Sequence, residues 1–320
     1  MRNLITVIIC THNPRQEYLD RVLKALNNQT LLRQEWELLL IDNASQRLLA
    51  SEIDLSWHPN SRHIREETLG LTAARLRGIK EANNDILVFV DDDNVLDPDY
   101  LKNTVAILEQ NPKIGAIGGK CLPEFEVEPE PWITQFYICL ALKDHGDEPK
   151  IYFRQQILDI PANDYPPFAP IGAGLILQKE LAEIYAKLVS QDTSRLALGR
   201  TGKRLVSGED NDIILTLLEA GWGVGYFPQL QLTHLISANR LTKDYLARLN
   251  YASSRSWIQV LDCHNIRPWK KIPQWSVLPR QLKAFFSYQA WKSSSAFIQW
   301  RGNCGMFEGL AALPANKTGL

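Results

Sequence analysis

The chain of 320 residues carries 35 Lys and Arg against 36 Asp and Glu, a net charge of −1, and 45% of its residues are hydrophobic. This composition is typical of a globular protein, and the near-zero charge argues against a general nucleic-acid-binding protein. The five cysteines are scattered without a CxxC pair, so neither a disulfide framework nor a zinc site is expected. Because no apolar run approaches ~18 residues, we expect a cytoplasmic protein.

Strand and helix patterns alternate along the chain. Apolar, β-branched runs predict buried strands, and apolar residues at helical spacing, such as Leu19, Val22, Leu23 and Leu26, predict helices between them. A short helix is expected at 132–142, among crowded prolines. The alternation predicts an α/β fold with a mostly parallel central sheet and helices on both faces. In chain order, the predicted strands are 4–10, 36–42, 85–90, 113–119, 173–178, 223–228 and 230–233. After the first helix, which contains Leu19 to Leu26, the main predicted helices are 71–82, 98–110 and 208–221.

Polar side chains follow three of these strands at the point where each strand ends. They are Thr11-His12-Asn13, Asp42-Asn43 and Asp91-Asp92-Asp93. Parallel strands bind ligands at their carboxyl edge, so these residues predict one crevice. Three adjacent carboxylates repel one another unless a cation neutralises them, and oxygen ligands of this kind suit Mg²⁺ or Mn²⁺. The alternative is a solvated acidic turn that caps the helix beginning near Pro98.

Four segments resemble the family 2 glycosyltransferases, which have the GT-A fold. They are VIICTHNPR, LLLIDNAS, TLGLTAARLRGIKEANNDILVFVDDDN and GEDNDIILTLLEAGWGVGYFP, in that order, over roughly residues 4–235. The resemblance implies a glycosyltransferase domain at 1–240, with a nucleotide-binding half at 1–120 and an acceptor half at 121–240. Residues 241–320 lie outside it and are expected to form a helical extension.

The resemblance implies how the nucleoside is bound. Thr11 and Asn13 would lie beside the nucleoside, and Asp42 would bond the base, usually uracil. Arg75 would sit near the base, ribose or phosphates, for which its planar fork is suited. The alternative for Arg75 is a helix-surface arginine paired to Glu67 or another acid. The family commonly has Tyr in place of His12 and Asn in place of Leu76.

The acidic cluster matches the family's DxD pair. Asp91 and Asp93 would bind Mn²⁺ or Mg²⁺, with Asp93 touching the ion directly, while Asp92 would face the ribose or the acceptor. His234, which follows a predicted strand, would be a further ligand of the metal or diphosphate. Its alternative is a structural hydrogen-bonding role.

A second acidic pair, Glu209-Asp210, begins a predicted helix. The resemblance makes Asp210 the base that accepts the proton of the attacking hydroxyl, with Glu209 orienting it or the acceptor. The alternative is a capping box that starts at Ser207. Gly172 and Ala173 would form the floor beneath the donor sugar, unless they are a plain turn.

These residues together predict an inverting, metal-dependent glycosyltransferase that uses a nucleotide-diphospho-sugar, the UDP-sugar being favoured. The acceptor would be a saccharide or a lipid-linked saccharide in surface polysaccharide or glycan biosynthesis. One alternative is a sugar-1-phosphate nucleotidyltransferase, although CTHNPRQ lacks the glycine-rich phosphate loop that such an enzyme needs. The other is a non-catalytic nucleotide-sugar-binding protein.

The C-terminal region is basic and rich in aromatic residues. From 251 to 320 nine Lys and Arg face two acidic residues, a net charge of +7, and five of the nine tryptophans lie there. Leu282, Phe286, Trp291 and Phe297 fall loosely on one helical face. Such a helix could lie in a membrane interface, here the inner face of the plasma membrane. Equally, its aromatic residues could pack on the acidic body or form a homodimer surface.

Overall fold

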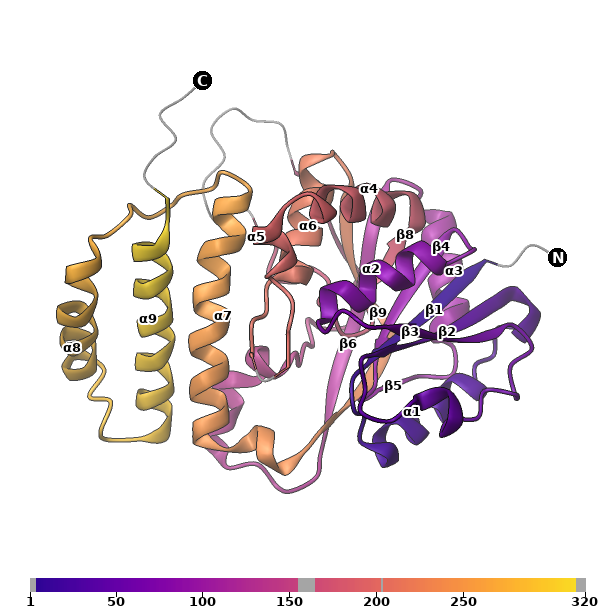
Figure 1. The fold of residues 1–320 in the computed structure, drawn as a ribbon, viewed down its shortest axis with the longest axis horizontal. Coiled ribbons are helices and arrows are strands. Elements are labelled where there is room, and N and C mark those ends of the chain that lie inside the picture. Colours follow the sequence, from indigo (N-terminus) through magenta and orange to yellow (C-terminus); the bar gives the residue numbers. More distant parts are fainter. Residues whose placement is uncertain (1–3, 155–164, 203, 315–320) are drawn as a thin grey trace.

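The computed structural model describes residues 4–154, 165–202 and 204–314. Within these residues one mixed sheet has the strand order β3-β2-β1-β4-β8-β6-β9-β5, and β7 pairs with β9. Figure 1 shows the sheet at the centre of the larger part of the molecule. The strands are β1 (Ile5–Thr11), β2 (Trp36–Asn43), β3 (Ser61–Glu66), β4 (Ile86–Asp91), β5 (Asn94–Leu96), β6 (Ile114–Phe125), β7 (Lys150–Tyr152), β8 (Ile176–Gln178) and β9 (Gly223–Ile236).

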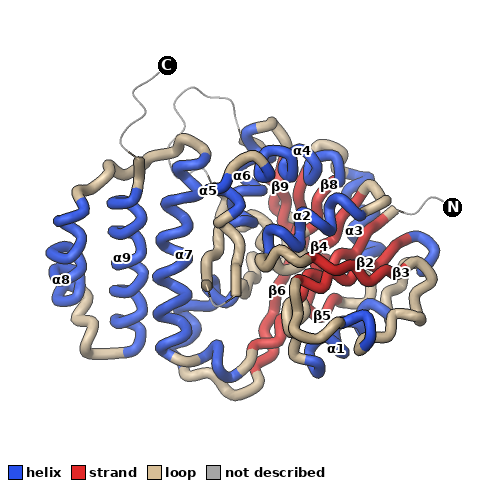
Figure 2. Tube along the Cα trace, in the orientation of Figure 1, coloured by secondary structure: helices blue, strands red, loops and turns tan. Residues whose placement is uncertain are grey.

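Helices cover both faces of the sheet (Figure 2). In β1, Val7 and Ile9 point into the core beneath α1 and α3, while Ile8 points into the core beneath α2, α4 and α6. This alternation follows from the two-residue period of a strand. The predicted buried face of the first helix, Leu19 to Leu26, is confirmed. The helices are α1 (Gln16–Asn27), α2 (Leu71–Glu81), α3 (Tyr100–Gln110), α4 (Lys179–Ser190), α5 (Thr193–Leu196), α6 (Glu209–Glu219), α7 (Lys243–Cys263), α8 (Val277–Ser287) and α9 (Ser294–Ala312).

The strands β3, β2, β1 and β4 are parallel neighbours. Their register places Thr11 opposite Asp42 and Cys10 opposite Asp91. The ends of β1, β2 and β4 therefore lie along one edge of the sheet, as the sequence predicts.

The other half of the sheet is built on the two long strands β6 and β9. They run parallel, and their register shifts between Gly118 and Lys120. A Cβ atom at Gly119 would lie 1.9 Å from the carbonyl oxygen of Leu230, so only glycine permits this close approach. The predicted strands 223–228 and 230–233 are one continuous strand, which passes through Pro228.

Three features of the fold differ from the prediction. Strands β3, β5 and β7 were not predicted. Helix α3 begins at Tyr100 with Asp99 as its N-cap residue, so Pro98 precedes the helix. The expected helix at 132–142 is a 3-10 helix, η3 (Pro131–Leu140).

Beyond β9, a short 3-10 helix, η4 (Ala238–Leu241), leads into α7. Figure 1 shows α7, α9 and α8 side by side at one end of the molecule, with α9 in the middle. The backbones of α7 and α9 approach so closely that a Cβ atom at Gly305 would lie 2.1 Å from the carbonyl oxygen of Tyr251. In the part of the chain that the structure describes, no helix has the length and hydropathy to cross a membrane.

Candidate active site

A cleft of about 310 Å³ opens at the carboxyl edge of β1 and β4. One wall is the sheet edge and α2, and another is formed by residues of 198–202 and 206–208, which precede α6. The cleft brings together ten of the twelve predicted site residues: Thr11, Arg75, Asp91, Asp92, Asp93, Gly172, Ala173, Glu209, Asp210 and His234.

The acidic cluster is built by the tight turn between β4 and β5. Asp91 ends β4, Asp92 and Asp93 form the turn, and Asn94 begins β5. The alternative of a cap for the next helix is wrong, because β5 intervenes before α3. The hydroxyl of Thr11 donates a hydrogen bond to Asp92 Oδ2. Burial raises the pKa of Asp92 to about 7, and the neighbouring charge of Asp93 acts in the same direction.

Asp93 faces a pair of basic side chains. Its Oδ2 atom lies 2.9 Å from Arg240 Nη1 and 3.2 Å from His234 Nε2. Although burial opposes ionisation, the charges of His234 and Arg240 hold the pKa of Asp93 well below its usual range. The guanidinium of Arg240 therefore neutralises the carboxylate that the sequence assigns to the metal.

The residues around Asp93 suit a divalent ion in their chemistry. Among the described residues no group of three His, Cys, Asp or Glu side chains is already arranged to hold a metal. Nevertheless, Asp91, Asp93 and His234 all line the cleft, and two carboxylates with one imidazole are ligands that Mn²⁺ accepts. The Nδ1 atom of His234 is buried and has no hydrogen-bond partner among the described residues. Arg240 and a metal ion would compete for the charge of Asp93.

Arg75 lies at the base of the cleft between two acids. Its guanidinium is 3.8 Å from Asp91 Oδ1 and 3.7 Å from Glu209 Oε2, and its side chain is 5% exposed. Burial acts to lower the pKa of Arg75, but the charges of Glu209 and Asp91 raise it. The alternative of a surface arginine is wrong, because Arg75 is buried, and its two acids are Asp91 and Glu209, while Glu67 pairs with Arg65.

The pair Glu209-Asp210 begins α6 and faces the cleft. Asp210 Oδ2 accepts a hydrogen bond of 3.1 Å from the backbone of Gly172, and the carbonyl of Gly172 accepts one of 3.4 Å from Arg75. Burial raises the pKa of Glu209, whose Oε2 atom accepts no hydrogen bond within the described residues. The predicted capping box does not form, because Gly208 is the N-cap residue and no side chain caps it.

Gly172 belongs to this arrangement through its lack of a side chain. A Cβ atom there would lie 2.8 Å from Arg75 Nη2. Glycine at this position therefore lets the backbone join Arg75 to Asp210. Ala173 also lines the cleft.

Asp42 and Asn13 are the two predicted site residues that the cleft does not include. The carboxylate of Asp42 accepts hydrogen bonds from the backbone of Ser45 and Leu49, and it pairs with Arg65 at 2.8 Å. It thereby holds the loop after β2. Asn13 bonds the same loop, through its backbone nitrogen to Ser45. Contact of either residue with a nucleobase stays a prediction.

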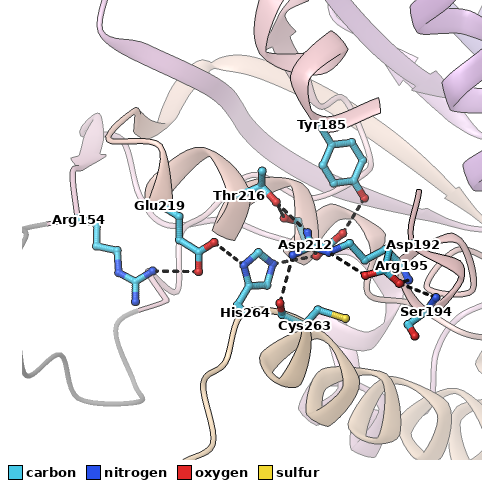
Figure 3. A network of polar contacts seen from close by, with 10 residues as sticks. All are labelled: Arg154, Tyr185, Asp192, Ser194, Arg195, Asp212, Thr216, Glu219, Cys263 and His264. Carbon is cyan, nitrogen blue, oxygen red and sulfur yellow. Dashed lines mark hydrogen bonds and ion pairs between the residues drawn. The ribbon is translucent and has the colours of Figure 1, made fainter. Parts of the chain in front are cut away.

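A buried ionic network fixes the helix that carries Glu209 and Asp210 (Figure 3). Asp212, in the first turn of α6, is fully buried, and its Oδ1 atom lies 2.9 Å from Arg195 Nη1 and 2.8 Å from His264 Nε2. The hydroxyl of Tyr185 donates to Oδ2 at 3.0 Å, and His264 Nδ1 lies 2.8 Å from Glu219. Side chains from α4, α5 and the end of α7 thus hold α6 in place.

Two cations of the cleft were missed by the sequence analysis. Arg240 comes from η4, and Arg200 comes from the segment between α5 and α6. Neither lies in a strand-end motif, so no local pattern marks them.

This fold is that of a GT-A glycosyltransferase. Residues 6–165, half of the chain, match the family model described as Glycosyl transferase family 2. The chain belongs to this family and is a glycosyltransferase, which removes the nucleotidyltransferase and non-catalytic alternatives.

Named relatives agree with this assignment. A glucosyl-dolichyl phosphate glucuronosyltransferase of Haloferax volcanii is 22% identical over 246 residues, which are 76% of this chain and 72% of that protein. The crystal structure of S. aureus TarS 1-349 matches with a TM-score of 0.54 and 13% identity, covering 96% of this chain and 89% of that one. Its complexes with UDP and UDP-GlcNAc match with a TM-score of 0.52, 12% identity and the same coverage. This structural likeness shows a shared fold.

Proposed function

We propose that the protein is an inverting, metal-dependent glycosyltransferase that transfers a sugar from a UDP-sugar to a saccharide or lipid-linked acceptor. The observation that carries the proposal is the convergence of Asp91, Asp93, Arg75 and Asp210 on one cleft. The fold-related TarS complexes with UDP and UDP-GlcNAc support a uridine donor. The relative named for glucosyl-dolichyl phosphate supports a lipid-linked acceptor in glycan biosynthesis.

In this proposal Asp210 is the general base. Its carboxylate accepts the proton of the acceptor hydroxyl as that oxygen attacks the anomeric carbon. The bond from the anomeric carbon to UDP breaks, and UDP leaves with the electron pair. Because the hydroxyl attacks in a single step on the face opposite UDP, the configuration inverts. The hydrogen bond from Gly172 to Asp210 Oδ2 orients the carboxylate. Glu209, held beside Arg75, orients the acceptor or the base.

Negative charge grows on the diphosphate as the bond breaks. Arg200 and Arg240 line the cleft and are suited to binding that charge. A divalent ion, Mn²⁺ or Mg²⁺, held by Asp91, Asp93 and His234 would supply further positive charge to the diphosphate. Thr11, Asn13 and Asp42 are assigned to the nucleoside, Asp92 to the ribose or acceptor, and Gly172 and Ala173 to the floor beneath the donor sugar.

The remaining proposals concern organisation and place. We retain the division into a glycosyltransferase domain at 1–240, with its halves at 1–120 and 121–240, and an extension at 241–320. A lipid-linked acceptor would require the reaction to occur at a membrane surface, which we propose is the inner face of the plasma membrane.

Calorimetric titration with UDP, GDP and ADP, in Mn²⁺ and in excess chelator, tests the donor assignment. We expect UDP to bind best and to lose at least about tenfold in affinity without the ion, since an ion held by Asp91 and Asp93 would add positive charge beside the diphosphate. Asp93→Asn should reproduce that loss, whereas Asp97→Asn, which alters an acid outside the cleft, should not. Equal affinity in chelator would remove the metal from the proposal, and tighter binding of GDP or ADP would remove the uridine assignment.

A further inference from the structure

The outermost helix, α8, exposes a stripe of large apolar side chains. Leu278 is 64% exposed, Leu282 53% and Phe286 64%, and their spacing of four residues places them on one side of the helix. Trp275, in the short 3-10 helix η5 (Gln274–Ser276) just before α8, is 78% exposed and precedes Leu278 by three residues. Trp291 is 56% exposed and packs against Phe286 with ring centroids 5.8 Å apart, which extends the stripe. We call these five residues the α8 stripe.

The opposite side of α8 packs against the rest of the protein. Val277 and Ala284 are buried, Phe285 meets Trp300 edge to face at 5.1 Å, and the indole of Trp300 donates to the carbonyl of Gln281. Helix α8 therefore already buries one side against α9. The α8 stripe lies on its other side and is not needed to attach α8 to the protein. Figure 1 shows α8 as the layer farthest from β2 and β3.

This result also corrects the sequence expectation of a single helical face. The turn at 288–293 divides the segment into α8 and α9. Phe297 lies on α9, is half-buried and packs on the main core, so it does not belong with Leu282 and Phe286. Part of the aromatic content thus packs inward, as one alternative held, and part stays exposed.

Apart from Glu308, whose carboxylate accepts hydrogen bonds from Gln281 of α8 and from Tyr251, the charge around the α8 stripe is positive. Residues 263–307 hold seven Lys and Arg, namely Arg267, Lys270, Lys271, Arg280, Lys283, Lys292 and Arg301, and no Asp or Glu. Five of them, Lys270, Lys271, Arg280, Lys283 and Lys292, are exposed. A two-fold dimer through this face would bring these like charges together, which is unfavourable. An anionic surface would instead complement them.

We propose that the α8 stripe is a membrane-docking surface that lies in the interface of an anionic phospholipid bilayer. An 11-residue helix is about 16 Å long, too short to span a bilayer, but it is long enough to lie along the surface. Tryptophan and phenylalanine insert at the level of the headgroups, and the lysines meet the lipid phosphates. This docking would hold the enzyme beside a lipid-linked acceptor. That consequence rests on the proposed function, whereas the docking itself does not.

Sedimentation of the full chain with sucrose-loaded vesicles tests the proposal. We expect binding to vesicles that contain phosphatidylglycerol, with weaker binding at higher salt, and little binding to pure phosphatidylcholine. A double variant, Leu282→Ser with Phe286→Ser, should bind the vesicles more weakly. The partition coefficient between buffer and vesicles should fall at least about tenfold for each apolar side chain removed. Because both residues are exposed, the double variant should keep the thermal midpoint of the wild type.

A matched control removes an exposed apolar pair from another helix. Ile184 and Leu188 of α4 are 52% and 39% exposed, and Ile184→Ser with Leu188→Ser should leave vesicle binding unchanged. Failure of the wild type to bind phosphatidylglycerol vesicles at low salt would overturn the proposal, as would equal loss in the control variant. Self-association that disappears in the α8 double variant, without vesicle binding, would assign the stripe to a second copy. The assay contains neither donor nor acceptor, so its result is independent of the nucleotide titration.

Discussion

The buried Asp212 network gives the sharpest stability prediction. Asp212→Asn keeps the shape of the side chain but removes the charge that faces both Arg195 and His264. Loss of one partner from a buried ion pair costs about 3–5 kcal/mol, because the other charge is left buried and uncompensated. Here Arg195 keeps its bond to the carbonyl of Cys263, and His264 keeps Glu219 and can release a proton. We therefore expect a loss at the lower end, about 3 kcal/mol.

Urea unfolding followed by fluorescence measures this free energy directly. The matched control is Asp192→Asn, which alters the exposed partner of the same arginine. Asp192 lies 3.8 Å from Arg195 and caps α5, a role that Asn fills equally well, so the change should cost less than about 1 kcal/mol. If Asp212→Asn costs no more than Asp192→Asn, the network does not hold α6, and the reasoning is wrong.

Two further predictions concern the charged groups around the site. Arg240→Gln should raise the affinity for Mn²⁺ without nucleotide by about tenfold or more, because a charged hydrogen bond that competes with the ion for Asp93 is removed. The free Mn²⁺ signal in electron paramagnetic resonance reports this, and unchanged or weaker binding would mean that Arg240 does not compete. Although burial opposes it, hydrogen bonds to Asp212 and Glu219 raise the pKa of His264 above its unfolded value near ~6.5. The stabilisation by this proton is complete below that pH and is lost as pH rises through the folded pKa, because the native state then binds more protons than the unfolded state. Urea midpoints above pH 6.5 should therefore fall less steeply for His264→Gln than for the wild type, and identical slopes would contradict this.

The parallel half of the fold was predictable because its strands are buried on both faces. Strands β1 and β4 are nearly continuous apolar runs, and each ends abruptly at polar residues. Strand β3 was missed because it is an edge strand in which Ile64 alone is buried, so SRHIRE shows no apolar pattern. Strands β5 and β7 have three residues each, too few for any period.

The site was predictable where motifs end strands or begin a helix. Asp91 to Asp93 and Glu209-Asp210 reach one cleft because the sheet edge and α6 meet there. Asp42 follows a strand in the same manner, yet its carboxylate is engaged by a loop and by Arg65, contacts that no local pattern reveals. Arg240 reaches Asp93 from 147 residues away in the chain, which depends on the pairing of β5 with β9.

The most direct test of the central claim is the turnover of Asp210→Asn. The assay follows UDP release from UDP-GlcNAc or UDP-glucose with Mn²⁺ and a short-chain prenyl-phosphate-linked glucose as acceptor. Asn preserves an oxygen for the hydrogen bond from Gly172 but is not a base, so transfer should fall by roughly 10²–10⁴. UDP affinity and the thermal midpoint should stay at their wild-type values. Near-native turnover by Asp210→Asn would contradict the account and would move the base to Glu209 or Asp92.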